Sequence, residues 1–226
     1  MLKSFDQIML ADYFNKCVKG YHMLNTEPIK EAVWESINSL VFKYSGIQIV
    51  SQACGSHSPG CDIETDIGKF SNKSAKYDAK CSSFSVSSYR LTSVTNSENP
   101  GTLENIFKEI DKRKNFDYYS VILREELENK GFKYDWYLIP SNYDVFNPSK
   151  FSWEPTIGKR GKNTGSQIGW NTISSDEGSM SITFSMSSQL WINVKVTEEM
   201  KKFKVATSTY DGEPPQIDYI MLSQKV

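Results

Sequence analysis

The segment between Ser56 and Lys80 gathers four carboxylates and several lysines in a stretch that alternates like a pair of β-strands. Hydrolysis of a phosphodiester needs a water nucleophile, charge neutralisation at phosphorus and help for the leaving oxygen, and bound Mg²⁺ can supply all three. Mg²⁺ prefers one or two carboxylates together with waters and phosphate oxygens. The segment therefore suits a magnesium site, with Asp62, Ser71 and Lys73 as its first candidate residues.

A hairpin would bring these three side chains together. Residues i and i+2 of a strand share a face, so Ser71 and Lys73 are expected side by side, with Asp62 facing them from the preceding strand. In this arrangement Asp62 binds the metal. Lys73 orients or deprotonates the attacking water, or stabilises the charge that develops in the transition state.

Two further carboxylates belong to the helix predicted between Thr26 and Gly46. Thr26 is a plausible N-cap, Pro28 stands just inside the helix, and Gly46 ends it. Glu31 and Glu35 are four residues apart and lie on one side, so the helix can present both carboxylates to a neighbouring strand. The predicted buried face carries Val33, Trp34, Ile37, Leu40, Val41 and Tyr44.

Two alternative interpretations of the charged segment stay open. In the first, Asp78 and Lys80 are the catalytic pair, because Asp78-Ala79-Lys80 spells a literal D-x-K. In the second, the segment is a small zinc-binding module. Its ligands are then Cys54, His57 and Cys61, spaced as C-x2-H-x3-C, with Cys81 as the fourth.

The remaining chain predicts a mixed α/β (α+β) fold, a mixed β-sheet flanked by helices. The pattern predicts helices over 5–21 and 100–114, in addition to the helix that carries the two glutamates. Strands are expected over 46–52, 61–67, 69–77, 83–94, 118–126 and 134–141, then a hairpin over 179–196 and late strands over 202–210 and 217–223. A chain of 226 residues with no internal repeat is expected to form one domain.

The composition narrows the classes of function. The formal net charge is −1, from 26 basic and 27 acidic residues, so any nucleic-acid affinity must come from local clusters. Only two histidines are present and no G-x-S-x-G or P-loop pattern occurs, which argues against histidine-dependent nucleases, serine hydrolases and nucleotide hydrolases. No apolar run reaches the roughly 20 residues of a membrane span and the first residues lack a secretory pattern, so we expect a cytoplasmic protein that does not enter membranes.

The charged segment resembles the PD-(D/E)xK nucleases, and among them the type II restriction endonucleases. The matching residues are "PGCDI" over 59–63, which ends beside Asp62, then "SNK" ending in Lys73, and "FSVSSYRLTS" over 84–93, which looks like the serine- and arginine-bearing strand that follows the catalytic lysine. The sequence departs from the family at Ser71, which stands where an Asp or Glu is usual. The helix with Glu31 and Glu35 resembles the family's leading helix, which often contributes an acid near the metals. The resemblance therefore implies that Glu35 is a catalytic and metal-binding residue and that Glu31 is a further metal ligand.

The resemblance implies a site-specific endodeoxyribonuclease of a restriction-modification system. It implies one or two Mg²⁺ per active site and a homodimer that cuts both strands of a short palindromic double-stranded DNA site, an A/T-only octamer cut bluntly being one candidate. It also implies one nuclease domain over 1–226, with a core of about 25–140 and DNA-contacting loops and hairpins of about 145–226. A DNA-binding domain without catalysis is the alternative, because Ser71 cannot supply the missing charge.

Candidate DNA contacts fall in three places. Gln can bond bidentately to adenine, while Ser and Thr suit either base edge, and Lys and Arg suit phosphates. The candidates are Ser85, Ser87, Ser88, Arg90 and Thr92 in the strand after Lys73, Lys159, Arg160 and Lys162 in a basic Gly-rich loop over 149–171, and Ser187, Ser188 and Gln189 in the late hairpin.

Overall fold

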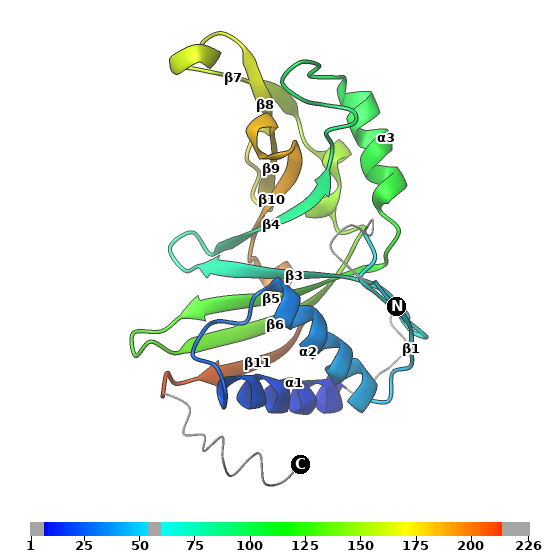
Figure 1. Ribbon diagram of the computed structural model, residues 1–226, viewed down its shortest axis with the longest axis vertical. Coiled ribbons are helices and arrows are strands. Elements are labelled where there is room, and N and C mark those ends of the chain that lie inside the picture. Colours follow the sequence, from blue (N-terminus) through cyan, green and yellow to red (C-terminus); the bar gives the residue numbers. More distant parts are fainter. Residues whose placement is uncertain (1–6, 54–59, 214–226) are drawn as a thin grey trace.

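The computed structural model of the chain describes residues 7–53 and 60–213. It is a mixed α+β fold in which a long mixed sheet is flanked by helices (Figure 1). The α-helices are α1 (Gln7–His22), α2 (Glu31–Tyr44), α3 (Leu103–Arg113) and α4 (Glu198–Lys201). Short 3-10 helices are η1 (Asp144–Phe146), η2 (Pro148–Lys150), η3 (Gly161–Asn163) and η4 (Phe184–Met186).

The strands form one connected sheet with two halves. The first sheet half has the order β11-β6-β5-β3, with the small strands β2 and β1 attached to β3, and the second has the order β4-β10-β9-β8-β7. The strands of the first half are β1 (Ile49–Gln52), β2 (Ile63–Thr65), β3 (Gly68–Asp78), β5 (Tyr118–Glu126), β6 (Phe132–Pro140) and β11 (Lys204–Tyr210). Those of the second are β4 (Ser83–Arg90), β7 (Trp153–Ile157), β8 (Gln167–Thr172), β9 (Gly178–Thr183) and β10 (Gln189–Lys195).

The two halves meet at β3 and β4. These antiparallel strands pair through only two residue pairs, Tyr77 with Phe84 and Asp78 with Ser83, and then diverge. In Figure 1 the second half rises away from β3 as a result. On its other side β3 pairs with β5, in parallel, from Phe70 to Lys76. β3 is therefore held firmly along one edge and loosely along the other.

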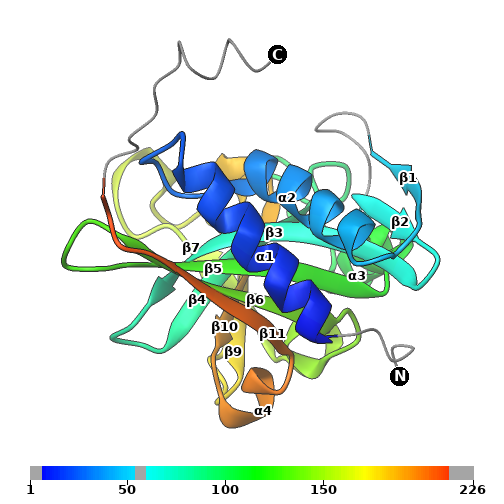
Figure 2. The same ribbon diagram turned by 90° about the horizontal axis from the view of Figure 1, so that it is seen from below.

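The helix-side core fills the space between α1, α2 and one face of the first sheet half. Figure 2 shows the two helices lying side by side across that face. Two indole N–H groups converge on one residue: Trp34 Nε1 of α2 donates to the Ser120 carbonyl at 3.0 Å, and Trp136 Nε1 donates to the Ser120 hydroxyl at 3.0 Å. The largest buried members of this core are Leu10, Phe14, Trp34, Phe42, Phe70, Tyr134 and Trp136.

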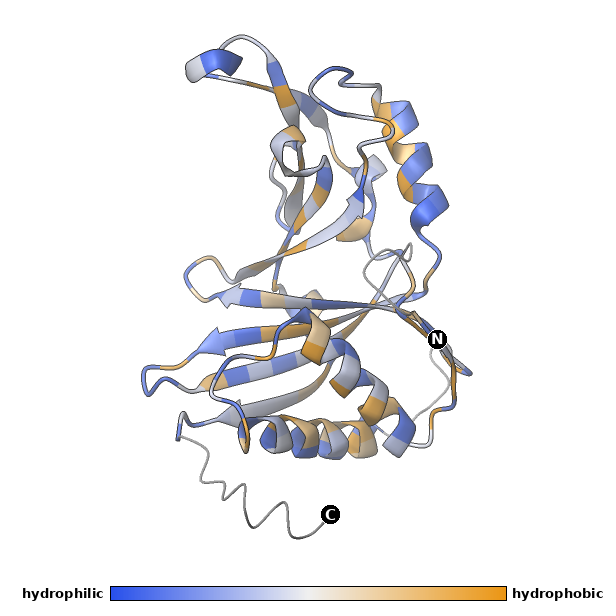
Figure 3. Cartoon of the chain, viewed as in Figure 1, coloured by the Kyte–Doolittle hydropathy of each residue, from blue (hydrophilic) through white to orange (hydrophobic). Residues whose placement is uncertain are grey.

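The inter-sheet core lies on the opposite face of β3 and β5, where the second sheet half and α3 pack against them. α3 is amphipathic, with a polar and an apolar side visible in Figure 3, and it buries Ile106 and Ile110. Thr102 caps it by accepting a hydrogen bond from the Asn105 N–H. Other buried members are Ala75, Phe84, Val86, Tyr119, Val121, Met180, Ile182, Ile192 and Val194.

The helix with the two glutamates differs from its prediction. α2 begins at Glu31 rather than within Thr26–Pro28. The backbone of Ile29 bonds to the Tyr134 and Ser74 hydroxyls instead of to a helical turn, and the chain is still extended at Lys30. Its buried face also differs. Asn38 and Phe42 are fully buried, whereas Leu40 and Tyr44, which were expected inside, are exposed: Leu40, 44%, and Tyr44, 58%.

The basic segment over 149–171 was predicted as a loop and is mostly a hairpin. β7 and β8 pair from Trp153–Thr172 to Ile157–Gln167, and η3 lies in their connection. Pro155 made a strand improbable from sequence, yet β7 is an edge strand, where proline is tolerated. The hairpin predicted over 179–196 is confirmed as β9 and β10. The strand predicted over 217–223 lies outside the described residues.

Candidate active site

The candidate site lies on the open edge of β3. β2 pairs with this edge only as far as Phe70, and β4 joins it again only at Tyr77, so in the described part of the chain no strand pairs with it in between. Ser71 and Lys73 lie in this gap. The N–H and C=O of one strand residue point to the same side, so the Asn72 carbonyl faces the gap together with its N–H. The gap therefore offers both main-chain and side-chain groups.

Asp62 closes one end of this gap. Its Oδ2 accepts a hydrogen bond from the Asn72 N–H at 2.6 Å and another from the Ser71 hydroxyl at 3.2 Å. Its own N–H donates to the Phe70 carbonyl at 2.8 Å, which continues the β2–β3 ladder by one residue. The expected placement of Asp62 opposite Ser71 is thus confirmed. Bonds to two donors fix the orientation of this carboxylate.

Lys73 links the strand to α2. Its Nζ lies 3.1 Å from Glu31 Oε1, and its side chain is only 16% exposed. Glu35 lies one turn further along α2 than Glu31, and both Asp62 and Lys73 are near enough to act on it electrostatically. The two glutamates of the helix and the two charged residues of the hairpin therefore form one cluster.

Burial sets the electrostatics of this cluster. It raises the pKa of Asp62 above the ordinary value for a carboxyl group, against the opposing effects of Lys73 and of the hydrogen bond from the Asn72 N–H. Burial likewise raises the pKa of Glu35, and repulsion from Asp62 and Glu31 adds to the shift. Partly desolvated carboxylates that repel one another gain from a further cation, since Lys73 supplies only one positive charge.

The donors around this gap are of the chemical type that Mg²⁺ binds. Asp62, Glu31 and Glu35 offer carboxylate oxygens, and the Asn72 carbonyl faces the same gap, all of them hard ligands of the kind this ion prefers. Within residues 7–53 and 60–213, no group of three or more His, Cys, Asp or Glu side chains is placed so that it could hold a metal ion together. An Mg²⁺ site does not need such a group, because the ion keeps several waters and binds substrate phosphate oxygens.

The alternative catalytic pair lies elsewhere. Asp78 Oδ1 accepts hydrogen bonds from the Lys80 N–H at 2.9 Å and the Cys81 N–H at 3.3 Å, so it caps the turn between β3 and β4. A strand rises about 3.3 Å per residue, which puts Asp78 roughly 20 Å along β3 from Ser71. The structure does not bring Asp78 and Lys80 to Asp62.

The length of β3 also separates two of the four proposed zinc ligands, Cys61 and Cys81. Cys61 precedes β2 and its thiol donates to the Ile63 carbonyl at 3.5 Å, whereas Cys81 is exposed beyond the far end of β3. Zinc–sulfur bonds are about 2.3 Å long, so these two thiols cannot share an ion across the length of a strand. Cys81 is therefore not a fourth ligand. Cys54 and His57 lie outside the described residues.

The predicted DNA contacts are scattered over the second sheet half. Those at the surface are Ser85, Arg90, Thr92, Lys159, Arg160, Lys162 and Ser187, and the half-buried ones are Ser87, Ser88 and Gln189. The Ser88 hydroxyl lies 3.3 Å from the Tyr119 hydroxyl, and Gln189 donates to the Ser88 carbonyl at 3.3 Å. Ser188 is fully buried. Its hydroxyl cannot touch DNA, so this contact was predicted wrongly, because a buried turn serine cannot be told from an exposed one by type.

Sequence reasoning did not single out Asn38 and Asn72. Both are fully buried, and Asn38 Nδ2 donates to Asn72 Oδ1 at 2.6 Å between α2 and β3. A signal was present, since Asn38 falls on the side of the helix that also carries Trp34 and Val41. A polar residue on an apolar stripe marks a buried hydrogen bond.

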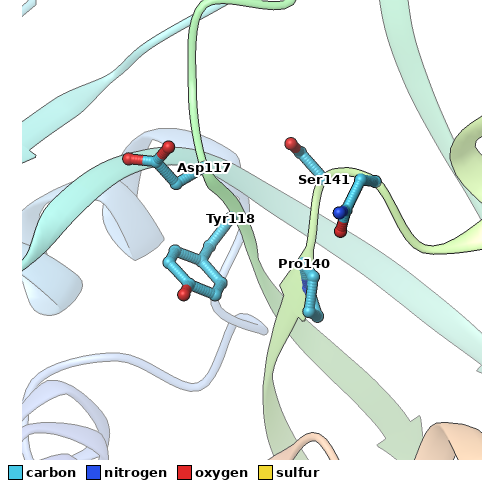
Figure 4. A pocket seen from close by; sticks show the side chains of 5 residues that line it. Asp117, Tyr118, Pro140 and Ser141 are labelled. Atoms are coloured by element: carbon cyan, nitrogen blue, oxygen red, sulfur yellow. The ribbon is translucent and has the colours of Figure 1, made fainter. Parts of the chain in front are cut away.

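A pocket opens at the start of β5 and the end of β6. It is lined by Asp117, Tyr118, Pro140, Ser141 and Asn142 (Figure 4). The Asp117 carboxylate already accepts a hydrogen bond from the Lys69 N–H at 2.9 Å, so the residue before β5 is tied to the start of β3. None of the predicted site residues lines this pocket.

Comparisons with protein families, with curated proteins and with solved structures find no match for this chain. Among the described residues, no helix is both long and apolar enough to cross a membrane.

Proposed function

We propose that this chain is a Mg²⁺-dependent endonuclease that hydrolyses both strands of a short palindromic duplex DNA site and acts as a homodimer. One observation carries the proposal: Asp62, Ser71 and Lys73 meet Glu31 of α2, with Glu35 one turn away, on a stretch of the β3 edge that no described strand pairs. This is the set of groups that a phosphodiester, a metal and a water would need in one place. The resemblance of the segment over 59–73 to the PD-(D/E)xK nucleases supports the same function.

Each residue of the site has its own role in the proposed hydrolysis. Mg²⁺ bound here supplies Lewis-acid stabilisation of the phosphate and lowers the pKa of its water. Asp62 would hold the ion from the hairpin, aided by the Asn72 carbonyl, and Glu35 and Glu31 would hold it from α2. Lys73 would supply an ammonium to orient the attacking water and to stabilise the developing charge. Ser71 orients Asp62 through its hydrogen bond.

The decisive experiment uses three lysine variants on one sequence-complex duplex, with Mg²⁺ or with EDTA. We expect discrete fragments with Mg²⁺ from the wild type and none from Lys73→Ala. Lys80→Ala tests the alternative catalytic pair, and Lys76→Ala is the matched control. Lys76 is on the same strand and is ion-paired with Glu126 at 2.8 Å on the surface, so its loss should leave cutting unchanged.

Each cleavage result points to a different site or function. Loss of cutting only with Lys80→Ala would move the catalytic centre to Asp78. No cutting by the wild type, on DNA that includes A/T-only octamers, would overturn the nuclease proposal. Ser71 favours the second candidate in that case, a DNA-binding domain without catalysis, because its hydroxyl contributes no negative charge. Such a domain would retard DNA in EDTA and leave it intact when Mg²⁺ is restored.

A further inference from the structure

The interface between α2 and β3 contains a buried pair of amides. Asn38 and Asn72 are both fully buried, and Asn38 Nδ2 donates to Asn72 Oδ1 at 2.6 Å. Apolar side chains of the same two elements lie in the same layer, among them Phe42 and Phe70, whose ring centroids are 4.7 Å apart. Asn38 Oδ1 and Asn72 Nδ2 have no hydrogen-bond partner among the described residues. Exchanging N and O in both amides would leave the same number of atoms unpaired.

Such a pair is not the choice that stability alone favours. A buried polar atom without a partner costs about 1–3 kcal/mol, and replacing both partners by apolar groups of similar shape is often neutral or stabilising. What a buried polar pair adds is specificity, because it rewards one relative placement of two elements and penalises others. The pair therefore fixes how α2 sits along β3.

Both partners are tied to the candidate site. The backbone N–H of Asn72 holds the Asp62 carboxylate at 2.6 Å, while its side chain holds Asn38. Asn38 lies three residues after Glu35 and seven after Glu31 on the same helix, so all three share one side of α2. Asn72 also stands between Ser71 and Lys73 on the strand. One residue thus connects the carboxylate of the hairpin with those of the helix.

We propose that Asn38 and Asn72 are positioning residues that set the distance between the α2 carboxylates, Glu31 and Glu35, and Asp62, and so determine the affinity of the site for a divalent cation. The inference rests on the proposed nuclease function and extends it from the ligands to the groups that align them. Partners that orient metal ligands without touching the metal usually change affinity or activity about 10- to 100-fold when they are removed.

The test separates alignment from stability by removing the amides one at a time and together. Asn38→Leu leaves the Asn72 amide unpaired, so it should lower both the stability and the metal affinity. The double variant Asn38→Leu/Asn72→Leu replaces both amides, so it should recover the stability of the wild type and keep the weakened metal affinity. We expect its affinity for Mn²⁺ and its Mg²⁺ requirement for cleavage to be about 10-fold weaker or more.

Two measurements and one control make the result specific. Calorimetric titration with Mn²⁺ in the absence of DNA reports metal affinity without activity, and denaturant unfolding of the same samples reports stability. Ser120→Ala is the matched control. Ser120 pairs with Asn72 across β3 and β5, and its hydroxyl accepts the buried bond from Trp136, so its loss should lower stability and leave Mn²⁺ affinity unchanged.

The outcomes distinguish this inference from the function on which it rests. If the wild type binds no Mn²⁺ and does not cut DNA, the proposed function fails and this inference falls with it. If the wild type binds and cuts, and the folded double variant does both equally well, the positioning role alone is overturned. Should the double variant not fold, Asn38→Ala measured at low temperature replaces it, and wild-type Mn²⁺ affinity in that variant also overturns the role.

Discussion

The two cores on opposite faces of β3 are built differently. In the helix-side core, polar groups join the helices to the strands through short hydrogen bonds, from Asn38 to Asn72 at 2.6 Å and from Trp34 Nε1 to the Ser120 carbonyl at 3.0 Å. In the inter-sheet core, the contacts between the sheet halves are mostly apolar. The Tyr119 hydroxyl adds a polar contact, at 3.3 Å from the Ser88 hydroxyl and 3.4 Å from the Tyr89 hydroxyl.

This difference indicates which elements are held in one position and which can shift. Hydrogen bonds are directional and hold α2 at one place along β3, whereas apolar packing is less selective about small displacements. The second sheet half is attached to β3 through only two residue pairs. We therefore expect the carboxylates of α2 to keep their positions while the second sheet half adjusts to a bound duplex.

The largest expected effect comes from Asp62, which belongs to neither core and lies at the edge where they meet. Asp62→Asn keeps an oxygen for the Asn72 N–H but removes the charge that would hold a metal. Cleavage should fall about 100-fold or more, while DNA binding is retained. Single-turnover cleavage and a gel-shift titration in EDTA measure the two effects.

Stability should not fall in the same variant. Burial raises the pKa of Asp62, so the charged form is disfavoured in the folded chain and a neutral amide is tolerated at neutral pH. Cleavage at the wild-type rate would remove Asp62 from the proposed site. An equal loss of DNA binding and cleavage would point to recognition instead.

The next test compares the cores directly. Trp34 and Phe84 are fully or almost fully buried, one in each core. Trp34→Ala and Phe84→Ala should each lower the free energy of unfolding by about 3–5 kcal/mol, because both leave a large cavity. Only Trp34→Ala should also raise the Mg²⁺ concentration needed for half-maximal cleavage, since only Trp34 lies on α2 between Glu31 and Glu35.

Urea unfolding gives the stability of both variants, and a Mg²⁺ titration of cleavage at low temperature gives the second quantity. The comparison breaks if Phe84→Ala shifts the metal requirement as much as Trp34→Ala does. The inter-sheet core would then position the carboxylates equally well.

The smallest expected effect is a pH dependence of the helix-side core. His22 is buried, its ring bonds the Asn25 carbonyl at 2.9 Å and the Tyr134 hydroxyl at 3.0 Å, and it stacks on Tyr210. Burial lowers its pKa below the ordinary 6.5. The unfolded chain therefore binds the proton more readily, and the contribution of the neutral ring to stability is present above about pH 6.5 and is lost as the pH falls through the lower value of the folded state.

His22→Phe keeps a ring in the stack and cannot be protonated. The difference in unfolding free energy between wild type and variant should thus shrink or change sign between pH 7.5 and 5.5, and urea unfolding at several pH values measures it. Carboxylates with raised pKa, such as Glu35, titrate in both proteins and cancel in the difference. A difference that does not change with pH would contradict a neutral buried imidazole.

Much of the local arrangement could be predicted from sequence, because it depends on local rules. Alternation along a strand and a short turn place Asp62 opposite Ser71, and the i, i+4 spacing on α2 places Glu31 and Glu35 on one side. The order of helices and strands followed in the same way. The β7–β8 hairpin was missed because its proline and glycines outweighed a weak alternation.

The tertiary part of the site could not be predicted. The contact between Lys73 and Glu31 joins residues 42 apart in the chain, and no periodicity encodes which helix covers which strand. Nor does residue type reveal burial: Asn38, Asn72 and Ser188 are fully buried although their types are usually exposed. These positions depend on the packing of α2 on β3 and on the turn between β9 and β10.

The unequal pairing of β3 has a consequence for amide hydrogen exchange. The backbone N–H groups of Lys73 and Ala75 point toward β5 and belong to the β3–β5 ladder. The Ser74 N–H points the other way, toward the open edge. Deuterium uptake along this one strand should therefore alternate from residue to residue, slow at Lys73 and Ala75 and fast at Ser74. A duplex lying along the open edge would slow the fast position, so the strand itself can report, without any label, when its free edge becomes covered.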